Sequence, residues 1–217
     1  DPTDVDEVCV FIHGINVPTQ AEARNGSYTL KQAFDKQRYD SFLVGFSWQS
    51  ELGIWWRPVE LARLNGIKLA QWILDRRKET DNSIRIVAQS LGAVVALEAL
   101  AELHRRRGDE DQSFRPLNSV TLVGAAAHAN APVKEYSGAI ETESHRTDNF
   151  YKKNDEVLGI LTVLERTKQL GRVGVTSSKN PPRSYRDHDV TNEVSDHNSY
   201  HQPDEGCVPD ILETFGR

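Results

Sequence analysis

The sequence predicts an α/β fold, built on a doubly wound, mostly parallel sheet with helices on both faces. Short apolar runs alternate with helical patterns of about 15 residues, as is typical of parallel sheets. The chain has 217 residues, 38% of them hydrophobic, which suits one domain spanning residues 1–217 with a substantial core. Polar residues suited to catalysis follow three of the apolar runs, at the end of the sheet where such folds place active sites.

The expected strands are short apolar runs bounded by polar or small residues. Residues 8–12 form a buried run that ends at His13-Gly14, and residues 83–87 form another that leads directly to a serine turn. The full set of expected strands comprises residues 8–12, 41–48, 84–88, 120–123, 148–152 and 185–190.

Helices are expected between these strands. Residues 58–77 carry apolar side chains at near-helical spacing, including Leu61 and Trp72. Residues 20–37 form a looser helical region, which the Asn-Gly pair at 25–26 interrupts. Further helices are expected at residues 91–107 and 156–170, with a short one after Pro209.

Composition excludes several classes of partner. The formal net charge of -6 argues against a nucleic-acid or anionic-membrane surface. No apolar run approaches the ~20 residues of a membrane span, so no stable membrane insertion is expected. The chain begins at Asp1 and contains no Met, so a removed leader stays open. The sequence identifies neither the compartment nor the oligomeric state. Cys9 and Cys207 lie far apart, and we expect two free, buried thiols.

Residues 87–93, with the sequence Val-Ala-Gln-Ser-Leu-Gly-Ala, place Ser90 between small residues at a strand-to-helix turn. This layout is typical of a nucleophile elbow, which exposes a serine hydroxyl above a sheet. The usual pattern is Gly-x-Ser-x-Gly, and Ala88 stands at the first glycine. Alternatively, Ser90 is only the N-cap of the following helix, a position that favours serine.

A serine nucleophile needs a histidine base, and the histidine needs a carboxylate that fixes its tautomer. In this type of sheet the expected chain order is Ser, Asp or Glu, then His. Asp155, just past a predicted strand, and His197, in the loop after the last strand, supply that order. The rivals for these two roles are Asp148 and Glu156 for the carboxylate, and His201 and His188 for the base.

The oxyanion formed during acyl transfer also needs donors. We expect the backbone N–H groups of Leu91 and Ile15 to supply them, with Gly14 allowing close backbone approach. His13 is expected to brace this loop rather than act as a base. Trp48, Trp55 and Trp56 either pack a helix onto the sheet or form an apolar wall of the substrate pocket.

Four segments together resemble the α/β-hydrolase superfamily: residues 10–15 (VFIHGI), 88–93 (AQSLGA), 151–158 (YKKNDEVL) and 196–200 (DHNSY). Residues 44–48 and 61–74 are also similar to compact hydrolases of haloarchaea and some bacteria. The resemblance implies a small esterase or lipase-like enzyme without a large lid, metal or cofactor, acting on a small-molecule ester.

The resemblance carries over Ser90 as nucleophile, Asp155 as acid, His197 as base, and the Ile15 and Leu91 amides as oxyanion donors. His13, Gly14, Gln89 and Trp48 are the expected pocket residues. The sequence departs from the family pattern at Ala88 and at Gln89, which replaces a frequent histidine. Two other hypotheses stay open: an amidase, peptidase or thioesterase with the same residues, and a non-catalytic binding or structural module with this fold.

Overall fold

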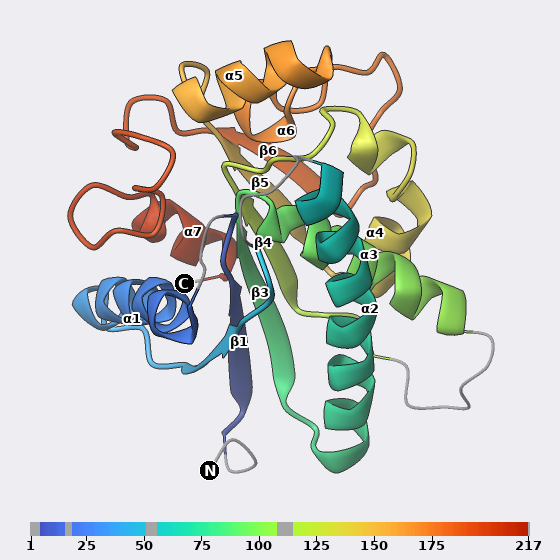
Figure 1. Cartoon of the computed structure of the whole chain (residues 1–217). Coiled ribbons are helices and arrows are strands. Elements are labelled where there is room, and N and C mark those ends of the chain that lie inside the picture. Colours follow the sequence, from blue (N-terminus) through green and yellow to red (C-terminus); the bar gives the residue numbers. More distant parts are fainter. Residues whose placement is uncertain (1–4, 16–18, 51–55, 108–114, 217) are drawn as a thin grey trace.

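The computed structural model describes residues 5–15, 19–50, 56–107 and 115–216 (Figure 1). Its strands form one six-stranded sheet in the order β2-β1-β3-β4-β5-β6, and every neighbouring pair is parallel. This confirms the predicted parallel sheet. The strands are β1 (Glu7–Ile12), β2 (Phe42–Phe46), β3 (Ser83–Gln89), β4 (Ser119–Val123), β5 (Thr147–Tyr151) and β6 (Tyr185–Asp189).

Helices cover both faces of the sheet, as the sequence predicts. Figure 1 shows α1 and α7 on one face, and α2, α3 and α4 on the other. The helices are α1 (Gln20–Lys36), α2 (Trp56–Glu79), α3 (Gly92–Arg106), α4 (Ser137–Glu143), α5 (Glu156–Glu165), α6 (Leu170–Val173) and α7 (Val208–Thr214), with a 3-10 turn at Ala131–Val133.

Two helix predictions are wrong. The Asn-Gly pair at 25–26 does not interrupt α1, because Gly26 leaves room for the ring of Phe11: a Cβ there would lie 2.9 Å from the Phe11 Cε1 atom. The helix predicted over residues 156–170 ends at Glu165, because Arg166 adopts a left-handed backbone with φ 53°. The chain then enters the separate short helix α6.

The sheet order places a topological switch point at β1. The chain passes from β1 to β2 on one side, and then to β3 on the other side of β1. Connections therefore leave in opposite directions after β1 and β3, and such switch points open a crevice beyond the carboxyl ends of the strands. The pair His13-Gly14 directly follows β1, and Ser90 directly follows β3.

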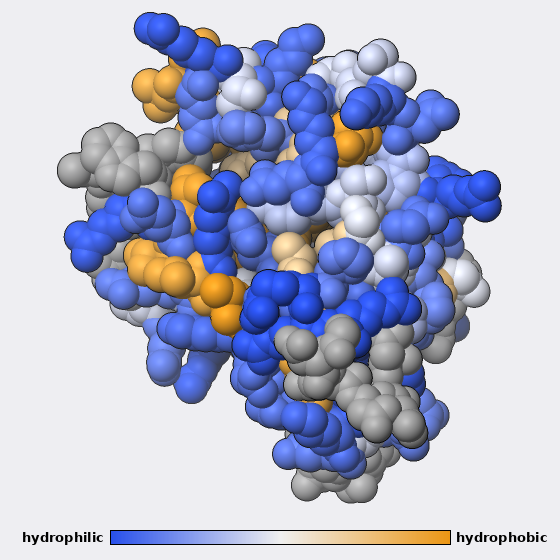
Figure 2. Space-filling model, turned by 90° about the vertical axis from the view of Figure 1, so that its right-hand side faces the viewer, coloured by the Kyte–Doolittle hydropathy of each residue, from blue (hydrophilic) through white to orange (hydrophobic). Residues whose placement is uncertain are grey.

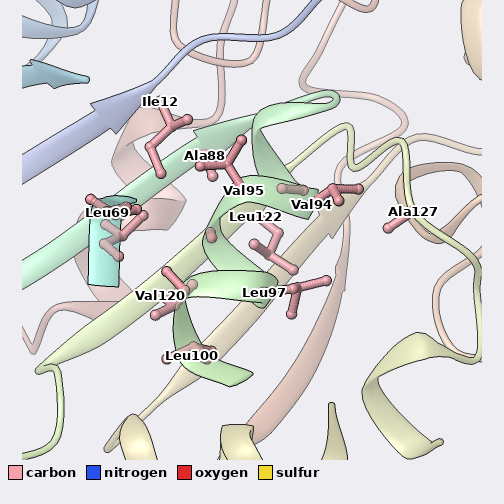
Figure 3. Close-up of a cluster of buried hydrophobic side chains, with 14 of the residues drawn as sticks. Ile12, Leu69, Ala88, Val94, Val95, Leu97, Leu100, Val120, Leu122 and Ala127 are labelled. Carbon is pink, nitrogen blue, oxygen red and sulfur yellow. The ribbon is translucent and has the colours of Figure 1, made fainter. Parts of the chain in front are cut away.

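The core lies in two layers because successive strand residues face opposite sides. In β3, Ile86 and Ala88 join the apolar cluster beneath α2 and α3, whereas Val87 joins the cluster beneath α1 and α7. Figure 3 shows part of the first cluster, with Ala88 near the α3 side chain of Val95. Cys9 and Cys207 are buried and unpaired, as expected, and burial raises the pKa of both thiols.

The surface contrasts with this interior. Figure 2 shows a face that is mostly hydrophilic, with hydrophobic groups in separate small patches. Within the described residues, no helix combines the length and apolar character needed to cross a bilayer.

Leucine truncation should separate core from surface. Leu97 of α3 is fully buried, so Leu97→Ala should lower the free energy of unfolding by about 2–5 kcal/mol through lost contacts and a cavity. Leu164 of α5 is 68% exposed, so Leu164→Ala should change it by less than about 0.5 kcal/mol. Urea denaturation of both variants measures the difference, and equal losses would contradict the packing described here.

Candidate active site

Ser90 occupies a strained turn between β3 and α3. Its backbone has φ 55°, a left-handed conformation that costs a residue with a side chain roughly 1–3 kcal/mol. Two hydrogen bonds hold the turn in place: Ser90 N–H donates to the Val123 carbonyl at 3.0 Å, and Ala126 N–H donates to the Ser90 carbonyl at 3.0 Å. The neighbouring strand β4 thereby stabilises the serine in this conformation.

Two glycines let the end of β1 lie against this turn. A Cβ on Gly92 would lie 2.6 Å from the Ile12 carbonyl oxygen and 2.7 Å from that of His13. A Cβ on Gly14 would lie 2.8 Å from the Ser90 Cβ. The departure at Ala88 is accommodated, because its methyl group is buried in the core beneath α3 (Figure 3).

The structure brings Ser90, His197 and Asp155 together. His197 Nε2 lies 2.8 Å from Ser90 Oγ, and His197 Nδ1 lies 2.7 Å from Asp155 Oδ2. A carboxylate only accepts, so His197 donates from Nδ1, and Nε2 is then the acceptor for the serine hydroxyl. The helix-cap alternative for Ser90 does not match this geometry, because Leu91 is the N-cap of α3 and no side chain caps it.

Each carboxylate oxygen of Asp155 accepts a hydrogen bond from a described residue. Its Oδ1 accepts a hydrogen bond from the Leu158 N–H at 2.9 Å, which caps α5, while Oδ2 faces His197. The cap fixes the carboxylate in one orientation at the carboxyl end of β5. The Asp155 side chain is therefore both the cap of α5 and the partner of His197.

Two further residues lie around Asp155 and His197, and the sequence analysis assigned neither of them a role. Tyr200 is fully buried, and burial and the nearby Asp155 charge raise its pKa. Asp196 accepts from the Asn198 N–H at 2.7 Å and from Ser199 Oγ at 2.8 Å, and these bonds lower its pKa. Such contacts order the loop that carries His197, but they depend on the folded loop, which a linear pattern does not reveal.

His13 holds the loop after β1. Its Nδ1 lies 2.9 Å from the Gly14 carbonyl, and its Nε2 accepts from the Trp48 N–H at 3.2 Å. This pairing requires a neutral imidazole with the proton on Nδ1, and burial lowers the His13 pKa in the same sense. Trp48 is buried, stacks on the His13 ring and donates from Nε1 to the His13 carbonyl.

The remaining expected pocket and oxyanion residues flank the serine. Leu91 is fully buried at the start of α3, where its N–H follows the nucleophile position. Ile15 is half-buried and follows Gly14, which touches the Ser90 turn. Trp55 lies outside the described residues.

The rival residues lie elsewhere. The buried Asp148, in β5, pairs with His188 Nε2 at 2.6 Å and with Arg146, both of which are partly exposed. Glu156 is exposed. Of the histidines that were not candidates, His128 is exposed, and His145 lines a cavity of about 240 Å³ at the amino ends of β3 and β4.

His201 is buried against the ring of Phe11, and its Nδ1 has no hydrogen-bond partner among the described residues. Burial lowers its pKa from an ordinary value near 6.5 to about 4. Between these two pH values, His201 therefore binds a proton in the unfolded chain but not in the folded chain. Stability is lost as pH falls through this window.

His201→Gln should reduce this acid sensitivity. We expect the wild-type free energy of unfolding to fall between pH 6.5 and 4, and the variant to lose less over the same range. Urea denaturation at several pH values measures both. His145→Gln, at an exposed position, is the matched control and should follow the wild type. Equal acid losses in wild type and His201→Gln would contradict the assignment.

Comparisons with known proteins bear on the family and the fold. A family model described as "Alpha/beta hydrolase of unknown function (DUF900)" matches residues 2–201. The mature form of the lipase BlEst2 from Bacillus licheniformis is similar at 14% identity and a TM-score of 0.56, over 99% of this chain and 93% of that chain. An uncharacterized protein from Bacillus cereus ATCC 10987 is similar at 13% identity and a TM-score of 0.51, over 97% of this chain and 60% of that chain. No curated protein sequence matches the chain.

At these identities the structural likeness bears on the fold alone, and it agrees with the parallel sheet and its flanking helices. The family match covers most of the chain, including the Ser90 turn and the loop of His197. The resemblance drawn from the sequence is thereby confirmed. The chain belongs to the alpha/beta-hydrolase family of unknown function, DUF900.

Proposed function

We propose that this hydrolase cleaves carboxylic esters through a serine acyl-enzyme. The observation that carries the proposal is the position of the His197 imidazole, 2.8 Å from Ser90 Oγ and 2.7 Å from Asp155 Oδ2. A hydroxyl, an imidazole and a carboxylate in hydrogen-bonded sequence are the groups that acyl transfer needs. The strained Ser90 turn supports the same role, because strain of this kind clusters at functional sites.

In the proposed reaction, Ser90 Oγ attacks the acyl carbon while His197 Nε2 takes the hydroxyl proton. Asp155 stabilises the imidazolium that forms. The Leu91 and Ile15 amides donate to the oxyanion, and the amino end of α3 adds a favourable dipole at Leu91. His197 then gives its proton to the leaving alcohol. Water, deprotonated by His197, releases the acyl group and restores Ser90.

An ester is the first substrate class to test, because one structurally similar protein is a lipase. The same residues could also cleave thioesters or amides, since the fold does not separate these reactions. A matched series of ester, thioester and amide substrates with one acyl group would rank the three classes. We expect the ester to have the highest kcat/KM.

Active-site labelling tests the proposal directly. A fluorophosphonate probe should react with the intact protein, and peptide mapping should find the adduct on Ser90. A chain-length series of p-nitrophenyl esters then defines the preferred acyl group. A folded protein that neither reacts with the probe nor turns over any ester in the series would sink the proposal.

A further inference from the structure

Gln89 lies beside the candidate nucleophile without belonging to the three hydrogen-bonded groups. It is the last residue of β3, and its side chain is 8% exposed. Because successive strand residues face opposite sides of the sheet, Gln89 points to the same face as Val87. The loop that carries His197 packs against this face as well. Its amide is therefore enclosed by loops from distant parts of the chain.

The Gln89 amide makes one hydrogen bond to each of two loops. Its Oε1 accepts from the Gly14 N–H at 3.2 Å, and its Nε2 donates to the His197 carbonyl at 3.2 Å. The partners fix the orientation of the amide, since an N–H must meet its oxygen and a carbonyl its nitrogen. One side chain thus joins the loop after β1 to the loop after β6.

We propose that Gln89 is a positioning residue that sets the His197 imidazole relative to the oxyanion-binding amides. The inference rests on the proposed function, because it assigns a role within that reaction. It also explains the donor choice in the first loop. Gln89 engages the Gly14 N–H, so this amide is not free to bind the oxyanion, and the next one along the chain is that of Ile15.

Few side chains could replace glutamine here. A glutamate could still accept from Gly14, but it would place a carboxylate against the His197 carbonyl, where a donor is needed. A methionine has a similar length and makes neither bond. The pair Gln89→Glu and Gln89→Met therefore separates the two bonds, and Gln32→Met on the exposed surface of α1 is a matched control.

The first measurement does not require catalysis. Amide hydrogen exchange, followed by NMR, should be slow at Gly14 in the wild type and in Gln89→Glu, and clearly faster in Gln89→Met. Unchanged slow exchange at Gly14 in Gln89→Met would show that the Gln89 side chain does not hold the two loops together. Because this measurement needs no substrate, it tests the link between the two loops even if the protein turns over no ester.

The second measurement is steady-state ester hydrolysis. Gln89→Met should lower kcat about 100-fold, the effect of a small misplacement of reacting groups, with KM changed less than kcat. Gln89→Glu should lower kcat and move the acid limb of the pH profile to higher pH, because a nearby carboxylate favours the imidazolium. Gln32→Met should match the wild type.

Two kinetic results would overturn the positioning role. One is a wild-type kcat in folded Gln89→Met. The other is a raised KM with unchanged kcat, which would assign Gln89 to substrate binding instead. If Gln89→Met does not fold, the polar, equally sized Gln89→Glu decides through its pH profile, and an unshifted acid limb with wild-type kcat counts against the proposal. If the fluorophosphonate probe does not label the wild type, this result would instead count against the proposed function.

Discussion

Replacing Ser90 with alanine is expected to lower kcat for ester hydrolysis by about a million-fold, to the limit of detection. The variant keeps the imidazole and the carboxylate but has no oxygen to attack the acyl carbon. Any turnover that persists must then come from the oxyanion donors and substrate binding alone. The measurement is p-nitrophenyl ester hydrolysis by purified wild type and Ser90→Ala, followed by acyl-enzyme trapping with mass spectrometry.

A second substitution controls for folding. Ser90→Gly should be as inactive as Ser90→Ala, yet more stable than the wild type by about 1 kcal/mol, because glycine adopts φ 55° without a Cβ penalty. Opposite changes in activity and stability would show that the serine is kept at a cost to the fold. Wild-type turnover in folded Ser90→Ala would show that Ser90 is not the nucleophile, whereas a folded wild type without any turnover would favour the non-catalytic hypothesis.

The parallel sheet was predictable because buried strands are continuous apolar runs. The apolar run from Val8 to Ile12 is short and rich in β-branched and aromatic residues, which favours a buried strand, and the structure pairs it with β2 and β3. The end of α5 was not predictable in the same way. Arg166 takes a left-handed backbone without a glycine or proline nearby to signal it. α4, only seven residues long, carries too little periodicity to be recognised.

The candidate site, like the fold, was predictable only in part. Chain order suggested Ser90, Asp155 and His197, because their positions after strands place them at one end of a parallel sheet. Which carboxylate and which histidine meet depends on side-chain directions, and Asp148 and His201 satisfied the same chain order. The Gln89 bonds span 75 and 108 residues, and no local pattern encodes contacts of that kind. Gly171 packs so closely against the backbone of Ala125 that a Cβ at this position would lie 2.0 Å from the Ala125 nitrogen. No local sequence pattern indicates this contact either.

Asp155→Asn is expected to lower kcat about 10⁴-fold while leaving stability nearly unchanged. Asparagine caps helices as well as aspartate does, so its side-chain oxygen can keep the bond from the Leu158 N–H. Its NH₂ group would then face His197 Nδ1, which would have to become an acceptor. The imidazole proton would move to Nε2, and His197 could no longer accept the Ser90 proton.

Asp155→Ala separates the two roles, because it removes the cap together with the histidine partner. It should lose the same activity and, in addition, about 1 kcal/mol of stability. Glu156→Gln, at the adjacent exposed position, should change neither quantity. Ester kinetics and thermal denaturation of the three variants provide the comparison. If folded Asp155→Asn kept kcat within about tenfold of the wild type, Asp155 would be a helix cap alone, and the tautomer of His197 would have to be fixed by another group.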